Sequence, residues 1–292
     1  MIRKTVFGAT LALLAASAAF TVTPAEAADS ASVVKHYAEL AEAKYQDSLT
    51  TAKALDAAID ALIATPSEAT LKAAKEAWIK ARVPYQQTEV YRFGNPIVDD
   101  WEGKVNAWPL DEGLIDYVDP SYGTESDSNP LYVANVIANP KIKINGEDYD
   151  ATDITPETLR GLNEAGEIEA NVATGYHAIE FLLWGQDLHG TGPGAGERPY
   201  TDYDKANCTG GNCDRRAAYL KAASTLLVAD LEDMVKAWAP DGEATKNVEA
   251  DPKAGLTAIL TGMGSLSYGE LAGERNEQRR GGLEIGRAAV AI

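Results

Sequence analysis

Histidine and basic residues are both scarce in this sequence. Only three of the 292 residues are histidine, which limits every hypothesis that needs an imidazole as metal ligand or general base. Lys and Arg together number 26 against 44 Asp and Glu, so the formal net charge is −18 at pH 7. Such a charge repels phosphate backbones and anionic lipid headgroups, and it argues against a nucleic-acid partner. Cationic partners, metal ions included, suit it better.

Long hydrophobic runs are also missing, apart from one at the start. Residues 1–27 combine a basic start at Arg3 and Lys4, an apolar run over 6–20 and a small-x-small cleavage site before Ala28. This pattern is typical of a cleaved secretory signal peptide. A transmembrane helix needs about 20 apolar residues, and neither this run nor any later stretch reaches that length. We therefore expect a soluble mature chain without a transmembrane span, in the periplasm or elsewhere in the cell envelope.

Cysteine occurs only at Cys208 and Cys213. In an oxidising compartment such a pair favours a disulfide, and in so short a loop the bond stabilises the fold by about 2 kcal/mol on the chain-entropy model. The alternative is a thiolate metal site, which would need two further ligands and finds no histidine close by in the sequence. We therefore predict a disulfide.

No convincing order of strands is present, and apolar residues recur mainly at helical spacing. The spacing predicts a long helix from Asp29 to Thr65 and a second helix after Ser67, on which Trp78, Arg82 and Glu89 share a face. Further helices are expected over 155–184 with a break near Gly166, over 214–238 and over 253–274. The predicted fold class is all-α, built of bundled helices.

Two segments depart from plain helical patterning. Residues 93–154 are rich in turn signals and predict a long irregular insertion with a hairpin over 141–148. Such segments often carry function. The last predicted helix contains several glycines, whose use inside a helix is to let a neighbouring element approach closely. These glycines are Gly262, Gly264, Gly269 and Gly273.

One histidine has a partner at helical spacing in an apolar segment. His177 and Glu180 stand three residues apart, so they share a helix face and could bind one ion together. His36 and Glu39 repeat the spacing, but in an ordinary amphipathic surface helix. The apolar residues 181–184 after Glu180 place the first pair in a core, where both side chains need partners. The alternative is a hydrogen-bonded core pair without further function.

Carboxylates elsewhere could complete a metal site around His177. Carboxylates together with one imidazole suit iron, manganese or zinc in a helix bundle, whereas surface salt bridges are the alternative for each of them. We expect the carboxylate oxygens of Glu89 and Asp111 within several ångströms of the His177 ring. The candidate ligands are His177, Glu180, Glu89 and Asp111, with Gly175, Arg82, Trp78 and Glu112 as supporting residues.

The sequence resembles the imelysin family, also called the M75 peptidase family, which includes iron-regulated periplasmic proteins. The resemblance rests on the Gly-x-His-x-x-Glu motif at Gly175, continued to Asp187, and on blocks at 81–94, 106–113, 198–203 and 267–275. It implies a fold of two helical-bundle halves, an envelope location and a site around the motif. It also implies a role in iron uptake, with other envelope iron-uptake components as partners.

The end of the sequence departs from the family. Family members continue past the block at 267–275 into a second bundle half, whereas residues 276–292 do not resemble them. We expect a helical imelysin-like domain over 28–275 whose second half is truncated or lost by a frameshift, or else a shortened variant of the family. The atypical tail 276–292 should be weakly held, and the last helix should expose apolar surface.

These observations favour a metal-binding protein, with iron as the expected metal and zinc as the alternative, at His177 and Glu180. A zinc-dependent peptidase is the main rival, although Phe181 stands where a His-x-x-Glu-His motif would have its second histidine. The third reading is a metal-free binding module for a haem, a peptide or a protein that uses the Trp- and Tyr-rich insertion. Whether the protein is an enzyme stays open at this point.

Overall fold

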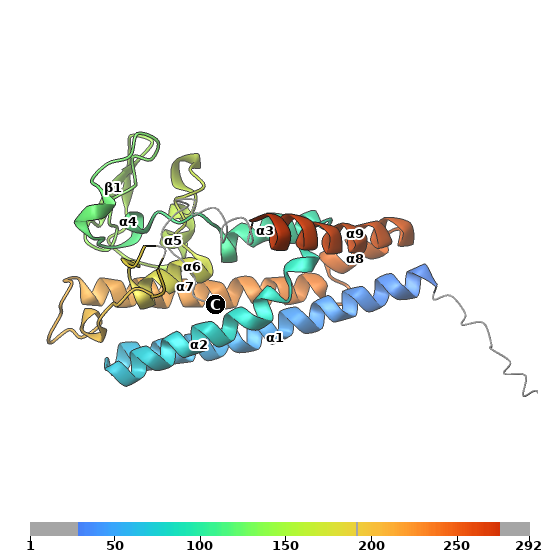
Figure 1. The fold of residues 1–292 in the computed structure, drawn as a ribbon, viewed down its shortest axis with the longest axis horizontal. Helices are drawn as coiled ribbons and strands as arrows, with labels where there is room; N and C mark the ends of the chain where they lie inside the picture. Colours follow the sequence, from blue (N-terminus) through green and yellow to red (C-terminus); the bar gives the residue numbers. More distant parts are fainter. Residues whose placement is uncertain (1–28, 191, 275–292) are drawn as a thin grey trace, which may run out of the picture.

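The computed structural model describes residues 29–190 and 192–274, so the predictions for the signal peptide 1–27 and the tail 276–292 lie outside the described residues. The secondary-structure elements of the described part are helices apart from one two-stranded hairpin, which confirms the all-α class. Its long helices α1 (Ser30–Ala64), α2 (Glu68–Gln86) and α7 (Cys213–Trp238) run along the length of the molecule, and α1 packs against both of the others (Figure 1). No helix in this part of the chain combines the length and apolar character that a bilayer crossing demands.

The boundary between α1 and α2 lies where the sequence predicts it. The side chain of Ser67 accepts a hydrogen bond from the backbone N–H of Thr70, and Oγ1 of Thr70 accepts one from the backbone N–H of Ser67. This reciprocal pair satisfies two donors that the first turn of a helix leaves free. The chain therefore turns back sharply, and α2 packs along α1.

The end of α2 corrects one prediction. Both the backbone N–H and Oγ1 of Thr88 donate to the carbonyl oxygen of Tyr85, at 2.8 and 2.7 Å. These two bonds occupy the carbonyl oxygen of Tyr85. It therefore does not accept the helical hydrogen bond from the backbone N–H of Glu89, and α2 ends. Glu89 instead begins a 3₁₀ turn, η1 (Glu89–Tyr91). The expectation that it shares the helix face of Trp78 is wrong.

The segment 93–154 is less irregular than predicted, because it begins with α3 (Pro96–Asn106) and contains α4 (Glu112–Ile115) and the 3₁₀ turn η2 (Pro120–Tyr122). The side chain of Asn95 accepts from the N–H of Ile97 and caps α3. The predicted hairpin is confirmed as antiparallel strands β1 (Lys141–Ile144) and β2 (Glu147–Asp150). Asn145 and Gly146 between them both have positive φ, as a tight hairpin turn requires.

A single arginine ties the hairpin region to α7. Arg215 donates hydrogen bonds of 2.6 to 3.0 Å to the carbonyl oxygens of Val136, Ile137, Ala151 and Thr152. Its planar fork of N–H groups can meet four acceptors at once, which an ammonium group on a flexible stem does less well.

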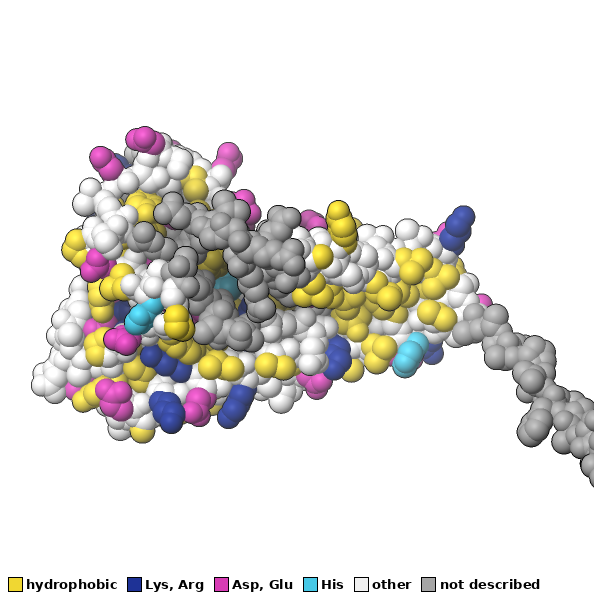
Figure 2. Space-filling model, in the orientation of Figure 1, with side chains coloured by type: hydrophobic (Ala, Val, Ile, Leu, Met, Phe, Trp, Pro, Cys, Tyr) yellow, Lys and Arg dark blue, Asp and Glu magenta, His cyan; other side chains and the backbone are white. Residues whose placement is uncertain are grey.

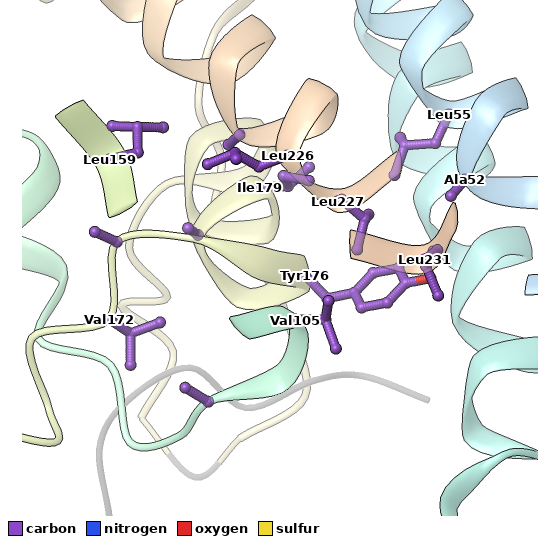
Figure 3. Packing of buried hydrophobic residues seen from close by; sticks show 14 of the residues in the cluster. Ala52, Leu55, Val105, Leu159, Val172, Tyr176, Ile179, Leu226, Leu227 and Leu231 are labelled. Carbon is purple, nitrogen blue, oxygen red and sulfur yellow. The ribbon is translucent and has the colours of Figure 1, made fainter. Parts of the chain in front are cut away.

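The helix predicted in the middle of the chain is interrupted over a longer stretch than expected. The helix expected over 155–184 is divided into α5 (Pro156–Leu162), the 3₁₀ turn η3 (Ala165–Glu167) and α6 (Gly175–Trp184), and the 3₁₀ turn η4 (Tyr200–Asp202) follows. The predicted disulfide between Cys208 and Cys213 is present at the start of α7. Figure 3 shows the core between α6, α7 and α1, where the Tyr176 side chain points towards Leu231 and Ala52. The residue that precedes His177 is thus anchored in the core.

Three helical segments follow α7 in the described residues, and the second of them exposes two large apolar side chains. They are α8 (Glu243–Glu249), α9 (Pro252–Gly264) and the π-helical η5 (Ser265–Glu274). In α9, Gly255 and Ala258 are buried, whereas Leu260 and Met263 are 67% and 55% exposed. Figure 2 shows hydrophobic side chains gathered where α9 lies above α1. The apolar surface predicted on this part of the chain is therefore present.

The glycines of α9 and η5 differ in what they do. A Cβ atom on Gly262 would lie 2.2 Å from the carbonyl oxygen of Val90, so the predicted close approach is confirmed there. A Cβ atom on Gly264 or Gly269 would meet no described residue within 4 Å, so the predicted close approach is not found for these two among the described residues. Close packing therefore requires Gly262, which faces η1, and also Gly255, where a Cβ atom would lie 2.4 Å from the carbonyl oxygen of Val248.

Candidate metal centre

Gly175 sets the position of α6. Its φ is +77°, and a Cβ atom there would lie 2.4 Å from the carbonyl oxygen of Val105, at the end of α3. The neighbouring Thr174 donates from Oγ1 to the carbonyl oxygen of Lys104 at 2.9 Å. The first turn of α6 therefore lies directly on the last turn of α3, and only glycine permits this approach. His177 is placed in that first turn.

His177 and Glu180 form the pair that the sequence predicts. Nδ1 of His177 lies 3.1 Å from Oε2 of Glu180, and the two side chains are 9% and 14% exposed. Because a carboxylate can only accept, Nδ1 carries the hydrogen and Nε2 keeps its lone pair. Within the described residues Nε2 has no hydrogen-bond partner, so it is the ring atom available to a ligand.

The surroundings of His177 favour the neutral form of its ring. Burial lowers the pKa of His177 below its ordinary value of 6.5, the carboxylate of Glu180 opposes this effect, and the charge of Arg82 adds to it. The neutral imidazole is the form that binds metal ions, so no proton has to leave the ring at pH 7.

The second His-x-x-Glu pair shows what the same spacing does on a surface. His36 and Glu39 on α1 lie 3.4 Å apart, but their side chains are 70% and 58% exposed. Water competes for both groups there, and the pair has the character of a solvated surface contact. The structure thus separates the two pairs by burial, as the sequence predicts.

Trp108 packs against His177, a contact that residue-by-residue reasoning missed. Its ring centroid lies 4.9 Å from that of His177, at an interplanar angle of 57°. The only sequence signal for this contact was the family block at 106–113, because the two residues are far apart in the chain. The insertion therefore contributes to the site through an aromatic ring.

Arg82 and Trp78, predicted as supporting residues, contact the residue before His177. Nε1 of Trp78 donates to the carbonyl oxygen of Tyr176 at 2.9 Å. The guanidinium of Arg82 lies 5.0 Å from the centre of the Tyr176 ring and donates to Oδ1 of Asn106 at 2.6 Å. The buried face of α2 thus holds α6 in place.

The other predicted carboxylates lie in different surroundings. Glu89 lines a small cavity together with Arg82, and Asp111 accepts a hydrogen bond from Asn129. Glu112 is buried, at 3% exposed, in the first turn of α4. Across residues 29–190 and 192–274, no three His, Cys, Asp or Glu side chains are grouped so that they could hold a metal ion. The assignment of Glu89 and Asp111 as metal ligands therefore stays a prediction.

Comparisons with known proteins find one relative in sequence and one neighbour in fold. Iron-regulated protein A from Synechococcus elongatus is 36% identical over 61 residues, which are 20% of this chain and 17% of that relative. The crystal structure of an iron-regulated protein A precursor from Parabacteroides distasonis has a TM-score of 0.55 and 20% identity, and the match covers 84% of this chain and 60% of that one. This neighbour shares the fold, and this chain spans less than two thirds of either protein. The family model described as Imelysin (Peptidase_M75) matches residues 41–282, which is most of the sequence, and the chain therefore belongs to the imelysin family.

Proposed function

We propose that this chain binds a metal ion, with iron as the first candidate, at His177 in an exported protein that takes part in iron uptake. The iron-regulated names of the two similar proteins support the choice of metal. The observation that carries the proposal is the hydrogen bond from Nδ1 of His177 to Glu180, with Nε2 unpartnered in the part of the chain that the structure describes. Histidines that bind metals commonly donate their other ring N–H to a carboxylate, which fixes the ring and raises its basicity.

This geometry gives the two residues different roles. We propose that Nε2 of His177 is the ligand atom and that Glu180 orients the ring from behind. Glu89 and Asp111 are the predicted further ligands, and their oxygens together with an imidazole suit iron, with zinc as the alternative. A site with one buried imidazole and open positions fits a metal that brings some of its own ligands.

Replacing His177 is the direct test. In protein purified without a histidine tag, His177→Ala should abolish retention of Fe²⁺ or Zn²⁺ in equilibrium dialysis, because it removes the only imidazole of the site. Helix content by circular dichroism should stay nearly unchanged, since little apolar surface is lost. His36→Ala is the matched control and should retain the metal. Equal loss in both variants, or none in either, would remove the site from α6.

Glu180→Gln separates the orienting role from direct ligation. The amide oxygen can still accept from Nδ1, but the negative charge is lost, so the affinity for Zn²⁺ should fall by about ten- to a hundredfold. Calorimetric titration measures the change. Loss of binding as complete as in His177→Ala would make Glu180 a ligand, and an unchanged affinity would exclude it from the site.

Zinc-dependent peptidase activity is the alternative function that the family name suggests. A catalytic zinc site takes three protein ligands and a general base, and the described residues group no three such ligands. Hydrolysis of an unfolded protein substrate, measured with and without a chelator, tests this activity.

A further inference from the structure

The disulfide loop, residues 208–213, is hydrogen-bonded to a buried cluster of charged side chains. The backbone N–H of Gly210 in this loop donates to Oδ1 of Asp202 at 2.8 Å. The next carbonyl oxygen, that of Gly211, accepts from Nη1 of Arg216 at 2.8 Å. Both Asp202 and Arg216 are 0% exposed, whereas most of the loop lies at the surface. The loop is therefore a surface segment fastened to two side chains of the interior.

The loop also packs closely on the cluster. A Cβ atom on Gly210 would lie 2.5 Å from Cε1 of Tyr117 and 2.8 Å from Oδ1 of Asp202, so only glycine fits there. The hydroxyl of Tyr117 donates to Oδ2 of the same carboxylate at 2.6 Å. Movement of the loop would thus break one hydrogen bond to Asp202 and remove the backbone that packs against the Tyr117 ring.

Asp202 connects this loop to the C-terminal end of α6. Its Oδ2 accepts from Nη1 of Arg198 at 2.8 Å, and the backbone N–H of Arg198 donates to the carbonyl oxygen of Trp184 at 2.8 Å. The hydroxyl of Tyr203, which follows Asp202 in the chain, donates to the carbonyl oxygen of Leu182 at 2.5 Å. The last carbonyl groups of a helix have no partner within the helix, so these two bonds hold the last turn of α6. The disulfide loop, η4 and α6 are therefore joined by one series of hydrogen bonds.

The two sulfur atoms differ in their surroundings. Cys208 is half-buried among exposed loop residues, whereas Cys213 is 3% exposed and is the first residue of α7. A thiolate from solution therefore attacks Sγ of Cys208, and Sγ of Cys213 is the leaving group. The N-terminus of a helix stabilises a thiolate, and a more stable thiolate leaves faster. Asp214 in the same turn opposes this effect, but it is exposed to solvent, which screens its charge.

We propose that the Cys208–Cys213 bond is a site of thiol–disulfide exchange, and that its reduction by a dithiol loosens the last turn of α6. The first thiolate of the dithiol bonds to Sγ of Cys208, the S–S bond breaks, and the electron pair leaves on Sγ of Cys213, which takes up a proton. The second thiolate of the reductant then displaces Sγ of Cys208, which is protonated in turn. The protein gains two electrons and two protons, and the dithiol becomes a disulfide.

Reduction acts on α6 through the freedom of the loop. Once Cys208 is no longer tied to the start of α7, the backbone between the two cysteines has more conformations open to it, and the bond from Gly210 to Asp202 opens more often. The series of hydrogen bonds through η4 then holds α6 less firmly. Since α6 also carries His177 and Glu180, the redox state of one bond acts on the helix that bears the candidate site. This inference goes beyond the proposed function and needs no bound metal.

Hydrogen exchange of the full chain, followed by mass spectrometry with and without dithiothreitol, tests the inference. The chain has only two cysteines, so this dithiol acts through one bond. In native buffer dithiothreitol should reduce the bond, and the amides of residues 181–186 and of Arg198 should then exchange at least about tenfold faster. The amides of residues 49–62, in the core of α1, are the internal control and should keep their rates.

The double variant Cys208→Ser, Cys213→Ser is the matched control. It should show the faster exchange without any reductant, and dithiothreitol should not change it further. A bond that dithiothreitol leaves intact in native buffer, or unchanged exchange of residues 181–186 after reduction, would overturn the inference. Exchange that rises equally over residues 49–62 would also overturn it, because the bond would then stabilise the fold as a whole.

The wild-type measurement decides even if the double variant does not fold. A response of the folded double variant to dithiothreitol would overturn the inference as well, since the reductant would then act elsewhere than on this bond. Metal binding is no part of the measurement, so each of these results leaves the proposed function standing.

Discussion

Asp116→Asn is expected to lower the free energy of unfolding by about 3–5 kcal/mol, among the largest effects of any single substitution in this chain. Its carboxylate, 1% exposed, accepts from Nη1 of Arg198 at 2.7 Å and from Nε and Nη2 of Arg216 at 2.6 and 3.0 Å. The two guanidinium groups are themselves buried, and Asp202 is the only other described carboxylate that pairs with them. Without Asp116, one buried positive charge is left uncompensated.

Urea denaturation with the disulfide intact measures this loss. Asp148→Asn is the matched control, because Asp148 pairs with Lys143 at 2.7 Å on the surface, where the two side chains are 89% and 65% exposed. Its removal should change the free energy of unfolding by less than about 1 kcal/mol. Similar effects of the two substitutions would show that burial of the Asp116 cluster contributes little.

The same cluster predicts a pH dependence with a definite sign. Burial alone would raise the pKa of Asp116, but Arg198 and Arg216 hold it below its ordinary value of 3.8. A carboxyl group with a lowered pKa stabilises the fold above its unfolded-state pKa, and this stabilisation is lost as the pH falls through the folded-state pKa. The wild type should therefore lose stability below about pH 4, and Asp116→Asn should lack this part of the acid transition.

Gly175→Ala is expected to destabilise the protein by about 2–4 kcal/mol and to weaken metal binding as well. The new Cβ atom would lie 2.4, 2.5 and 2.8 Å from the O, C and Cα atoms of Val105, and the positive φ adds strain. Since backbone atoms cannot swing aside as a side chain does, α6 would have to shift away from α3, and His177 would move with it.

Thermal unfolding and metal titration of the same samples check this expectation. Gly264→Ala is the control on α9, because its Cβ would meet none of the residues that the structure describes within 4 Å. Alanine favours a helix over glycine, so this variant should be unchanged or more stable by up to about 1 kcal/mol. If Gly175→Ala were as stable as Gly264→Ala, the contact between α6 and α3 would not limit the position of the motif.

The sequence predicts those features that depend on neighbours along the chain. The apolar stripes of α1, α2 and α7, the Ser67 cap, the Asn145–Gly146 turn and the disulfide are all of this kind. The spacing of Val98, Trp101 and Val105, which are buried in α3, was also helical, but turn signals on both sides concealed it. Local pattern therefore accounts for most of the helices.

The surroundings of the site could not be predicted in the same way. The contact of Trp108 with His177 and that of Arg82 with Tyr176 join residues from three separate elements. Local sequence patterns do not determine which face of α2 packs against α6. They also do not determine where the residues after α3 lie relative to α6. The prediction that Glu89 lies on the same helix face as Trp78 is wrong for a related reason. The bonds that Thr88 makes to Tyr85 end the helix before Glu89.

The packing of α1 has a consequence for the order in which the chain folds. Its partner α2 follows after a turn of three residues, whereas its contacts with α7 join positions more than 160 residues apart, such as Asp56 with Lys221 and Ser224. Local pairs form early because closing a short loop costs little entropy, and distant pairs form late. We therefore expect an α1–α2 hairpin to form before α7 has been synthesised. Leu55 and Ile59, which are buried in the folded protein, should stay exposed to contact with other chains until α7 docks.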